Sequence, residues 1–216
     1  MRVLLRRADS RGDILRCRQL IADVYNRDYD VVFSEDHYDL EAKVEPWPHR
    51  FLMALHDGDL VAACGLYMHD TYVERFGQVE DADLRRLIER EGVGDQYDVA
   101  HRREFTKMSV RHDWRGRGIA PWLTGAGHSR HFTDVESDRA LMVFCAKISI
   151  IDNIFHRAGL RTRTIKEFPF YKVHELYRSP SDPMESRLII PKADIPERWY
   201  DLALPREYEI ERLPRP

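Results

Sequence analysis

The segment Arg115-Gly116-Arg117-Gly118-Ile119-Ala120 lies between a strand-like run, residues 104–110, and a helix-like run, residues 121–128. A glycine-rich turn from a strand into a helix leaves backbone N–H groups unpaired, and the helix dipole adds partial positive charge there. Gly118 and Ala120 let a ligand approach the backbone, and the two arginines can bond phosphate. The segment therefore predicts an anion site, the alternative being an ordinary turn with surface arginines.

Arg115, Gly118 and Ala120 match an Arg/Gln-x-x-Gly-x-Gly/Ala pattern, and with its flanking elements this segment resembles the GNAT N-acyltransferases. In that family the loop holds the pyrophosphate of coenzyme A. The resemblance implies a mixed α/β sheet whose fourth and fifth strands splay apart, with the cofactor in the wedge. The cofactor-binding residues that it implies are Met108, Ser109, Val110, Arg115, Gly116, Arg117, Gly118, Ile119, Ala120 and Asn153.

The order of hydrophobic runs predicts strand, helix, hairpin, strand, loop, helix, strand, helix, strand and strand, which is that of a mixed α/β sheet. The expected strands are residues 2–7, 50–56, 60–67, 103–110, 141–147, 160–165 and 170–177, and the helices follow Asp9 or Ser10 and cover 79–91, 121–128 and 150–157. We expect a GNAT domain over residues 1–178. Residues 179–216 are rich in proline and predict an extension that packs on the domain or on a partner subunit, with residues 187–190 as a last strand.

The composition excludes several classes of protein. The 216 residues are 43% hydrophobic and 33% charged. Their net charge of −3 provides no overall electrostatic attraction to nucleic acid. Three widely spaced cysteines favour free thiols over disulfides or zinc, and His128 and His131 lack a third ligand, so no metal is expected. No apolar stretch reaches membrane-spanning length and the first residues do not form a signal peptide, which predicts a soluble, cytoplasmic protein.

Glu104 is the predicted general base for deprotonating an amine. It lies on strand four, eleven residues before Arg115, the spacing that the resemblance implies for the catalytic glutamate of histone acetyltransferase-type GNATs. Strand alternation is expected to place Glu104, Thr106 and Met108 on one face, beside the acyl group. The alternative is a structural ion pair with Arg102 or Lys107.

The general acid is harder to assign. Many GNATs carry a tyrosine four residues before the glycine that ends the helix after strand five, and here Phe155 stands four residues before Gly159. Phenylalanine cannot donate a proton. His156 points about 100° away on a helix, so solvent or Ser149 would protonate the thiolate.

A looser resemblance links the chain to acyl-homoserine-lactone synthases and N-acyl amino acid synthases. Strand four reads Glu104-Phe105-Thr106-Lys107, which is similar to their Glu-x-Ser-Arg, and the first helix carries Arg16 and Arg18. Segments 24–30 and 71–76 add to the likeness. That branch takes acyl groups from acyl carrier protein.

These patterns together predict an N-acyltransferase that moves an acyl group, acetyl or longer, from acyl-coenzyme A to a primary amine of a small molecule or amino acid. One alternative is a long-chain synthase that depends on acyl carrier protein, for which a deep apolar tunnel between strands four and five is expected. A second is a non-catalytic acyl-coenzyme A-binding module, which Phe155 favours. A homodimer stays open.

Overall fold

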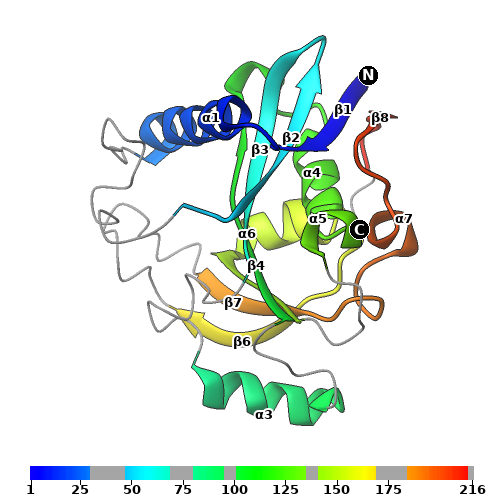
Figure 1. Ribbon diagram of the computed structural model, residues 1–216. Helices are drawn as coiled ribbons and strands as arrows, with labels where there is room; N and C mark the ends of the chain where they lie inside the picture. The colour runs from blue at the N-terminus through cyan, green and yellow to red at the C-terminus, as the bar shows by residue number, and fades with distance from the viewer. Residues whose placement is uncertain (30–46, 69–79, 95–100, 135–140, 169–183, 214–216) are drawn as a thin grey trace.

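The computed structural model of the chain describes residues 1–29, 47–68, 80–94, 101–134, 141–168 and 184–213 (Figure 1). Its strands are β1 (Arg2–Arg7), β2 (Arg50–His56), β3 (Asp59–Tyr67), β4 (Arg102–Val110), β5 (Leu141–Lys147), β6 (Arg163–Phe168), β7 (Met184–Ile189) and β8 (Arg206–Glu209). Its helices are α1 (Arg11–Tyr29), α3 (Asp81–Glu91), α4 (Ile119–Gly127), α5 (Arg130–Thr133), α6 (Ile148–Ile150) and α7 (Glu197–Tyr200), with a 3₁₀ turn at His112–Trp114 and a π-helical turn at Ile151–Phe155.

The described strands form one mixed sheet in the order β6-β7-β5-β4-β3-β2-β1-β8. All neighbouring pairs are antiparallel except β4 and β5, which are parallel. The predicted mixed α/β fold class is confirmed. The predicted hairpin between β2 and β3 is also present, and its turn residues Asp57 and Gly58 have φ angles of 49° and 86°. Two successive positive φ angles are typical of the turns that suit the twist of a hairpin.

Helices cover both faces of the sheet. On one, here called the α1 face, α1 packs Cys17, Leu20, Ile21 and Val24 on β2 and β3, and α3 packs Leu84, Leu87 and Ile88 on β5 and β7. On the other, called the α4 face, α4, α5 and residues 148–155 pack on the middle of the sheet. The helices expected after Asp9 or Ser10 and over residues 79–91 are thus present, and their apolar residues pack on the sheet. Ser10 caps α1, because its hydroxyl accepts a hydrogen bond from the amide of Asp13 at 3.0 Å.

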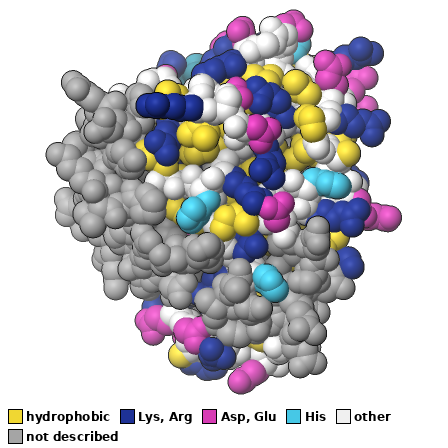
Figure 2. Space-filling view, viewed as in Figure 1, with side chains coloured by type: hydrophobic (Ala, Val, Ile, Leu, Met, Phe, Trp, Pro, Cys, Tyr) yellow, Lys and Arg dark blue, Asp and Glu magenta, His cyan; other side chains and the backbone are white. Residues whose placement is uncertain are grey.

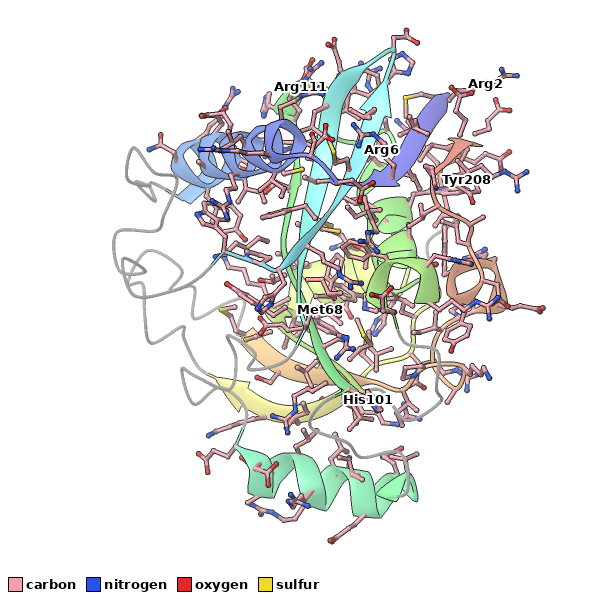
Figure 3. All side chains as sticks on the ribbon, viewed as in Figure 1. Arg2, Arg6, Met68, His101, Arg111 and Tyr208 are labelled. Atoms are coloured by element: carbon pink, nitrogen blue, oxygen red, sulfur yellow. The ribbon has the colours of Figure 1, made fainter. Side chains whose placement is uncertain are left out.

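The C-terminal part of the chain contributes to the sheet at both ends. β7 lies between β5 and β6, and β8 pairs with β1, so that Tyr208 lies opposite Val3 (Figure 3). The sequence placed the end of the main domain at residue 178, which lies outside the described residues, and that boundary stays a prediction. Residues 184–213, on the far side of it, nevertheless form an interior strand and an edge strand of the same sheet.

One further expectation differs from the structure, and one is not tested by it. The strand expected at 160–165 is β6, Arg163–Phe168, because Ala158 to Leu160 still belong to the turn that closes the preceding helix. The strand expected at 170–177 lies outside the described residues. Among the described helices, none is both long and apolar enough to cross a membrane.

Candidate active site

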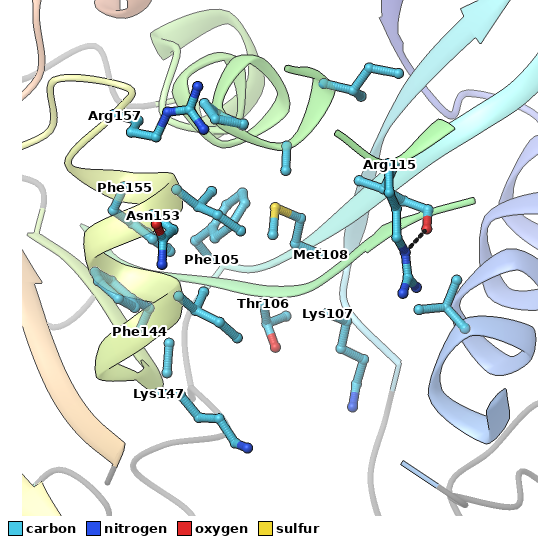
Figure 4. Close-up of a pocket in the computed structure, with 18 of the residues that line it drawn as sticks. Phe105, Thr106, Lys107, Met108, Arg115, Phe144, Lys147, Asn153, Phe155 and Arg157 are labelled. Carbon is cyan, nitrogen blue, oxygen red and sulfur yellow. Dashed lines mark hydrogen bonds between the residues drawn. The ribbon is translucent and has the colours of Figure 1, made fainter. Parts of the chain in front are cut away.

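The parallel strands β4 and β5 separate partway along their length. Residues Arg102–Glu104 pair with Leu141–Val143, and beyond that point β4 continues to pair with β3 while β5 pairs with β7. The splayed strands border a cavity of about 440 Å³ (Figure 4). The predicted wedge between strands four and five is therefore present, and each strand turns an edge without a strand partner toward it.

A β-bulge in β4 overturns the predicted alternation. Lys107 has a φ of 49°, and the pairing with β3 shifts register at this point. Thr106 and Lys107 consequently both face the α1 face, where the Lys107 ammonium lies 5.9 Å from the Tyr25 ring centre. Met108 turns to the α4 face, where its sulfur accepts a hydrogen bond from Thr124 at 3.1 Å. The expectation that Met108 shares a face with Glu104 was wrong, because the extra residue of a bulge reverses the alternation after it.

The cavity has two chemically different sides. Toward the α4 face its walls are apolar and come from both strands and from residues 150–155, namely Phe105, Met108, Phe144, Ala146, Ile150, Ile154 and Phe155. Toward the α1 face they are mixed, with the polar side chains of Thr106, Lys107 and Lys147 beside Val24, Tyr25 and Cys145. Figure 4 shows Thr106, Lys107 and Lys147 pointing away from the aromatic side chains.

An aromatic cluster closes the apolar side. The Phe155 ring stacks on Phe144 with centroids 4.0 Å apart and an interplanar angle of 9°, and it meets Phe105 edge to face at 5.8 Å. Phe155 is only 3% exposed. The position where many GNATs carry a tyrosine hydroxyl is therefore filled by a packed hydrocarbon ring, which offers no proton.

His128 lies behind this cluster and is buried. Its ring is 4.9 Å from that of Phe105, and its Nδ1 donates a hydrogen bond to the Thr124 carbonyl at 2.6 Å. Burial lowers the pKa of His128 to about 4, although the bond to Thr124 opposes the shift. His131 of the same predicted pair is exposed. The described residues contain no group of three His, Cys, Asp or Glu side chains that could hold a metal ion.

The 115–120 segment forms a tight turn at the start of α4. Gly116 and Gly118 adopt left-handed φ angles of 73° and 90°. The amides of residues 116–118 donate to no acceptor among the described residues, and those of Ile119 and Ala120 lie in the first turn of α4, where no intrahelical partner exists. A row of free N–H groups at a helix N-terminus is typical of anion sites.

The two arginines of the loop are engaged elsewhere. The Arg115 guanidinium donates to the Val110 carbonyl at 3.2 Å and forms an ion pair with Asp28 at the end of α1. Arg117 stacks over the Trp114 ring at 4.6 Å and does not line the cavity. The backbone of the loop is thus better placed to hold a phosphate than these side chains, whose predicted role in cofactor binding stays a prediction.

Arg157 is a cavity residue that sequence reasoning missed. Its Nη2 donates to the Leu213 carbonyl at 2.6 Å, and its Nε is buried without a hydrogen-bond partner. Asn153, which was predicted, also lines the cavity, one helical turn before Arg157, and its amide donates to the Ser149 carbonyl at 2.8 Å. An arginine four residues after the predicted asparagine was the available signal, because side chains at that spacing share one side of a helix.

The other predicted cofactor residues lie around the same cavity. Its walls include Met108, Val110, Arg115, Gly116, Gly118, Ile119, Ala120 and Asn153. Ser109 is buried on β4 and its hydroxyl donates to the Lys107 carbonyl at 3.4 Å. Ser109 and Arg117 are the two predicted cofactor residues that do not line the cavity.

Glu104 lies at the apex of the wedge, where it pairs with Val143 across the two strands. It is 2% exposed, faces the α1 face and is not part of the cavity wall. Its carboxylate lies near Cys145, a cavity residue whose thiol pKa is raised to about 12 by burial and, to a smaller extent, by the Glu104 and Glu185 charges. A thiol with so high a pKa is not a nucleophile at neutral pH, so Cys145 forms part of the wall.

Comparison with solved structures identifies the fold. No protein-family model and no curated protein matches the chain. Solved structures match over most of its length. FeeM, an N-acyl amino acid synthase from uncultured soil microbes, has a TM-score of 0.58 at 11% identity and covers 90% of this chain and 92% of its own. BjaI, a CoA-dependent acyl-homoserine lactone synthase, has a TM-score of 0.56 at 14% identity. The match covers 93% of this chain and 87% of BjaI.

A spermidine N-acetyltransferase chimera of SpeG from Vibrio cholerae and hSSAT matches with a TM-score of 0.52 at 11% identity, covering 87% of this chain and 95% of the chimera. The chain has the GNAT fold. The resemblance read from the 115–120 segment is confirmed at the level of the fold, and so is the looser likeness to the two synthase groups.

Proposed function

We propose that the chain is an N-acyltransferase that moves an acyl group, acetyl or longer, from acyl-coenzyme A to the primary amine of a small molecule or amino acid. The observation that carries the proposal is the wedge between β4 and β5, with free loop amides at one end and two chemically different sides. BjaI is a CoA-dependent acyl-homoserine lactone synthase and FeeM is an N-acyl amino acid synthase, which agrees with this donor and this acceptor class.

The donor binds from the α4 face. The amides of residues 116–120 hold its pyrophosphate, and the free edge of β4 from Met108 to Val110 pairs with the pantetheine amides. Asn153 and Arg157 border the same channel from the opposite wall. The acyl chain ends against the cluster of Phe105, Phe144 and Phe155, where an apolar group loses no hydrogen bonds on burial.

The acceptor enters from the α1 face. Its amine nitrogen attacks the thioester carbon, the carbon–sulfur bond breaks, and the amine loses one proton while the thiolate gains one. Glu104 is buried at the apex of the wedge, behind the cavity wall, and takes the amine proton through a water. Phe155 cannot supply the thiolate proton, so the proton comes from solvent or from Ser149, which lies exposed at the start of the helical segment.

The test is calorimetric titration of the protein with acetyl- and octanoyl-coenzyme A, followed by an assay of thiol release with amine acceptors. Binding of either donor together with acceptor-dependent release of coenzyme A supports the proposal. Absence of donor binding in a folded protein overturns it. Binding without any turnover identifies the non-catalytic module, for which the buried Phe155 is the favouring observation.

The second candidate is the long-chain synthase that takes its acyl group from acyl carrier protein. The likeness to FeeM and the aromatic, apolar side of the cavity favour it. Octanoyl groups offered on acyl carrier protein and on coenzyme A separate the two donors. A kcat/KM at least tenfold higher with the carrier protein would assign the chain to the second candidate.

A further inference from the structure

Three phenylalanine rings close the apex of the wedge on its α4 face. Glu104 and Val143 are the last residues that pair between β4 and β5, so Phe105 and Phe144 are the first residues beyond the pairing, one on each strand. Strand alternation turns both rings away from the face of Glu104. Phe155 completes the group, stacked on Phe144 at 4.0 Å and edge to face with Phe105 at 5.8 Å (Figure 4).

The packing behind these rings leaves them no room to retract. A β-carbon added to Gly127 of α4 would lie only 2.4 Å from the Phe105 ring, so the ring lies directly against the helix backbone. The next residue, His128, has its ring 4.9 Å from Phe105 and 6.0 Å from Phe155. His128 is 1% exposed and does not line the cavity. At the apex the cavity therefore ends at the phenylalanines.

The length between the donor-binding edge and these rings is short. In the proposed binding mode the pantetheine pairs with β4 from Met108 onward, and Phe105 lies three residues nearer the apex. Three residues of strand advance about 10 Å, and the bulge at Lys107 shortens this distance. A thioester with a short acyl group fills that length. A longer chain would have to push the rings into a core that is already close-packed.

The described outer surface provides no comparable place for the rest of a long chain. Among the described large hydrophobic side chains only Leu15 is exposed. Figure 2 shows basic and acidic side chains interspersed over the described part of that view. Methylene groups that do not fit into the cavity therefore stay in contact with water and add nothing to binding.

We propose that the donor carries a short acyl group, hexanoyl at the longest, and that the Phe155 ring sets this limit. The inference rests on the proposed acyl transfer and narrows its donor. Phe155 comes from the π-helical turn Ile151–Phe155 and not from either strand, so it is the ring whose replacement leaves the wedge itself unchanged. Phe155, which offers no proton, thus has a function of its own as the end of the acyl pocket.

The test is calorimetric titration with coenzyme A and with its acetyl, butyryl, hexanoyl, octanoyl and dodecanoyl thioesters. Each methylene group that the cavity buries should raise the affinity about fourfold. We expect this rise to stop at or before hexanoyl, so that octanoyl and dodecanoyl bind no more tightly than hexanoyl. A rise that continues to dodecanoyl overturns the inference, and so does one affinity shared by the whole series.

Two variants assign the limit to Phe155. In Phe155→Ala the octanoyl donor should bind about 10- to 20-fold more tightly than the hexanoyl donor, because two more methylene groups are buried. Phe155→Leu keeps more of the packing and should show a smaller gain, which covers the case that the alanine variant does not fold. Phe132→Leu is the matched control, since Phe132 is buried in the same core but outside the cavity wall. An unchanged limit in a folded Phe155 variant contradicts the assignment.

The titration with coenzyme A itself separates this inference from the proposed function. If coenzyme A does not bind to the folded protein, the proposed function fails and the inference fails with it. If coenzyme A binds and the affinity of its thioesters rises through dodecanoyl, the inference alone fails, and the long-chain synthase gains support. A rise that ends by hexanoyl and is extended in the Phe155 variants supports both.

Discussion

Gly118 of the loop and Glu211 of the C-terminal segment are in contact: a β-carbon added to Gly118 would lie 3.1 Å from the Glu211 carbonyl oxygen. The same carbonyl accepts a hydrogen bond from the Trp122 indole at 3.1 Å. Two residues later, the Leu213 carbonyl accepts a hydrogen bond from the Arg157 guanidinium. The segment after β8 thus supports the back of the loop and one wall of the cavity.

We predict that Gly118→Ala costs more stability than Gly58→Ala. Both glycines have a positive φ, 90° and 86°, so both variants should lose roughly 1–2 kcal/mol of unfolding free energy from backbone strain. Space around Gly58 is open, whereas Gly118 abuts Glu211, so Gly118→Ala should lose about 1 kcal/mol more than Gly58→Ala. Urea unfolding of both measures the difference. Equal losses would show that the C-terminal segment yields without cost.

We predict that a negative charge at residue 116 weakens donor binding. Gly116 has a φ of 73° and open space around its Cα, and Asp and Asn tolerate that conformation best after glycine. Gly116→Asp should bind acyl-coenzyme A about tenfold more weakly than Gly116→Asn, because a carboxylate then faces the pyrophosphate. The two variants match in size and strain. Calorimetry that finds equal affinities would place the pyrophosphate elsewhere.

We predict that Glu104→Gln lowers turnover about 10²- to 10⁴-fold at neutral pH, with partial recovery at high pH as the amine loses its proton unaided. Glu185→Gln is the matched control, since Glu185 is also buried on the sheet, lies outside the cavity wall, accepts a hydrogen bond from Thr164 and forms an ion pair with Arg187. Turnover and urea unfolding are measured on both. If each variant loses activity only in step with its folded fraction, Glu104 is structural.

We predict that His128 makes the protein less stable as the pH falls from about 6.5 to about 4. The folded protein keeps His128 neutral down to about pH 4, whereas the unfolded chain protonates it near its ordinary pKa. The unfolded state therefore binds the extra proton in this window, which costs the fold roughly 3 kcal/mol across it. The stabilising contribution is complete above pH 6.5.

Urea unfolding at several pH values measures this effect. His128→Asn keeps a donor for the Thr124 carbonyl and should remove most of the slope between pH 4 and 6.5. His131→Asn, at an exposed position on the same segment, should leave the slope intact. Losses below pH 4 belong to other groups, such as Asp13, whose pKa Arg6 holds at about 2. A slope that survives in His128→Asn would contradict the assignment.

The sequence predicted the parts of the fold that carry strong local signals. The glycines at 116 and 118 marked the loop, the Asp57-Gly58 pair marked the hairpin, and apolar residues at helical spacing marked α1 and α3. Each of these signals arises within a few residues of the chain, where backbone conformation depends on the residues themselves.

The parts that escaped prediction depend on contacts across the chain. Lys107 gives no sign of its positive φ, because lysine is not a residue that favours that conformation, and the bulge that it forms redirects Met108. β7 reads Met184-Glu185-Ser186-Arg187-Leu188-Ile189, which has no clear alternation, since its polar residues pair with Thr164 and with one another inside the sheet. Arg157 was missed because its partner, the Leu213 carbonyl, is 56 residues away.

The position of β7 has a consequence for synthesis of the protein on the ribosome. Met184 follows Lys147 by 37 positions, so β5 emerges well before the strand that pairs with its outer edge. At about 5–20 residues per second, that edge waits roughly 2–7 s for its neighbour. An unpaired apolar edge is a template for association with other nascent chains. We expect the yield of soluble protein to depend on elongation rate between these two strands more than anywhere upstream.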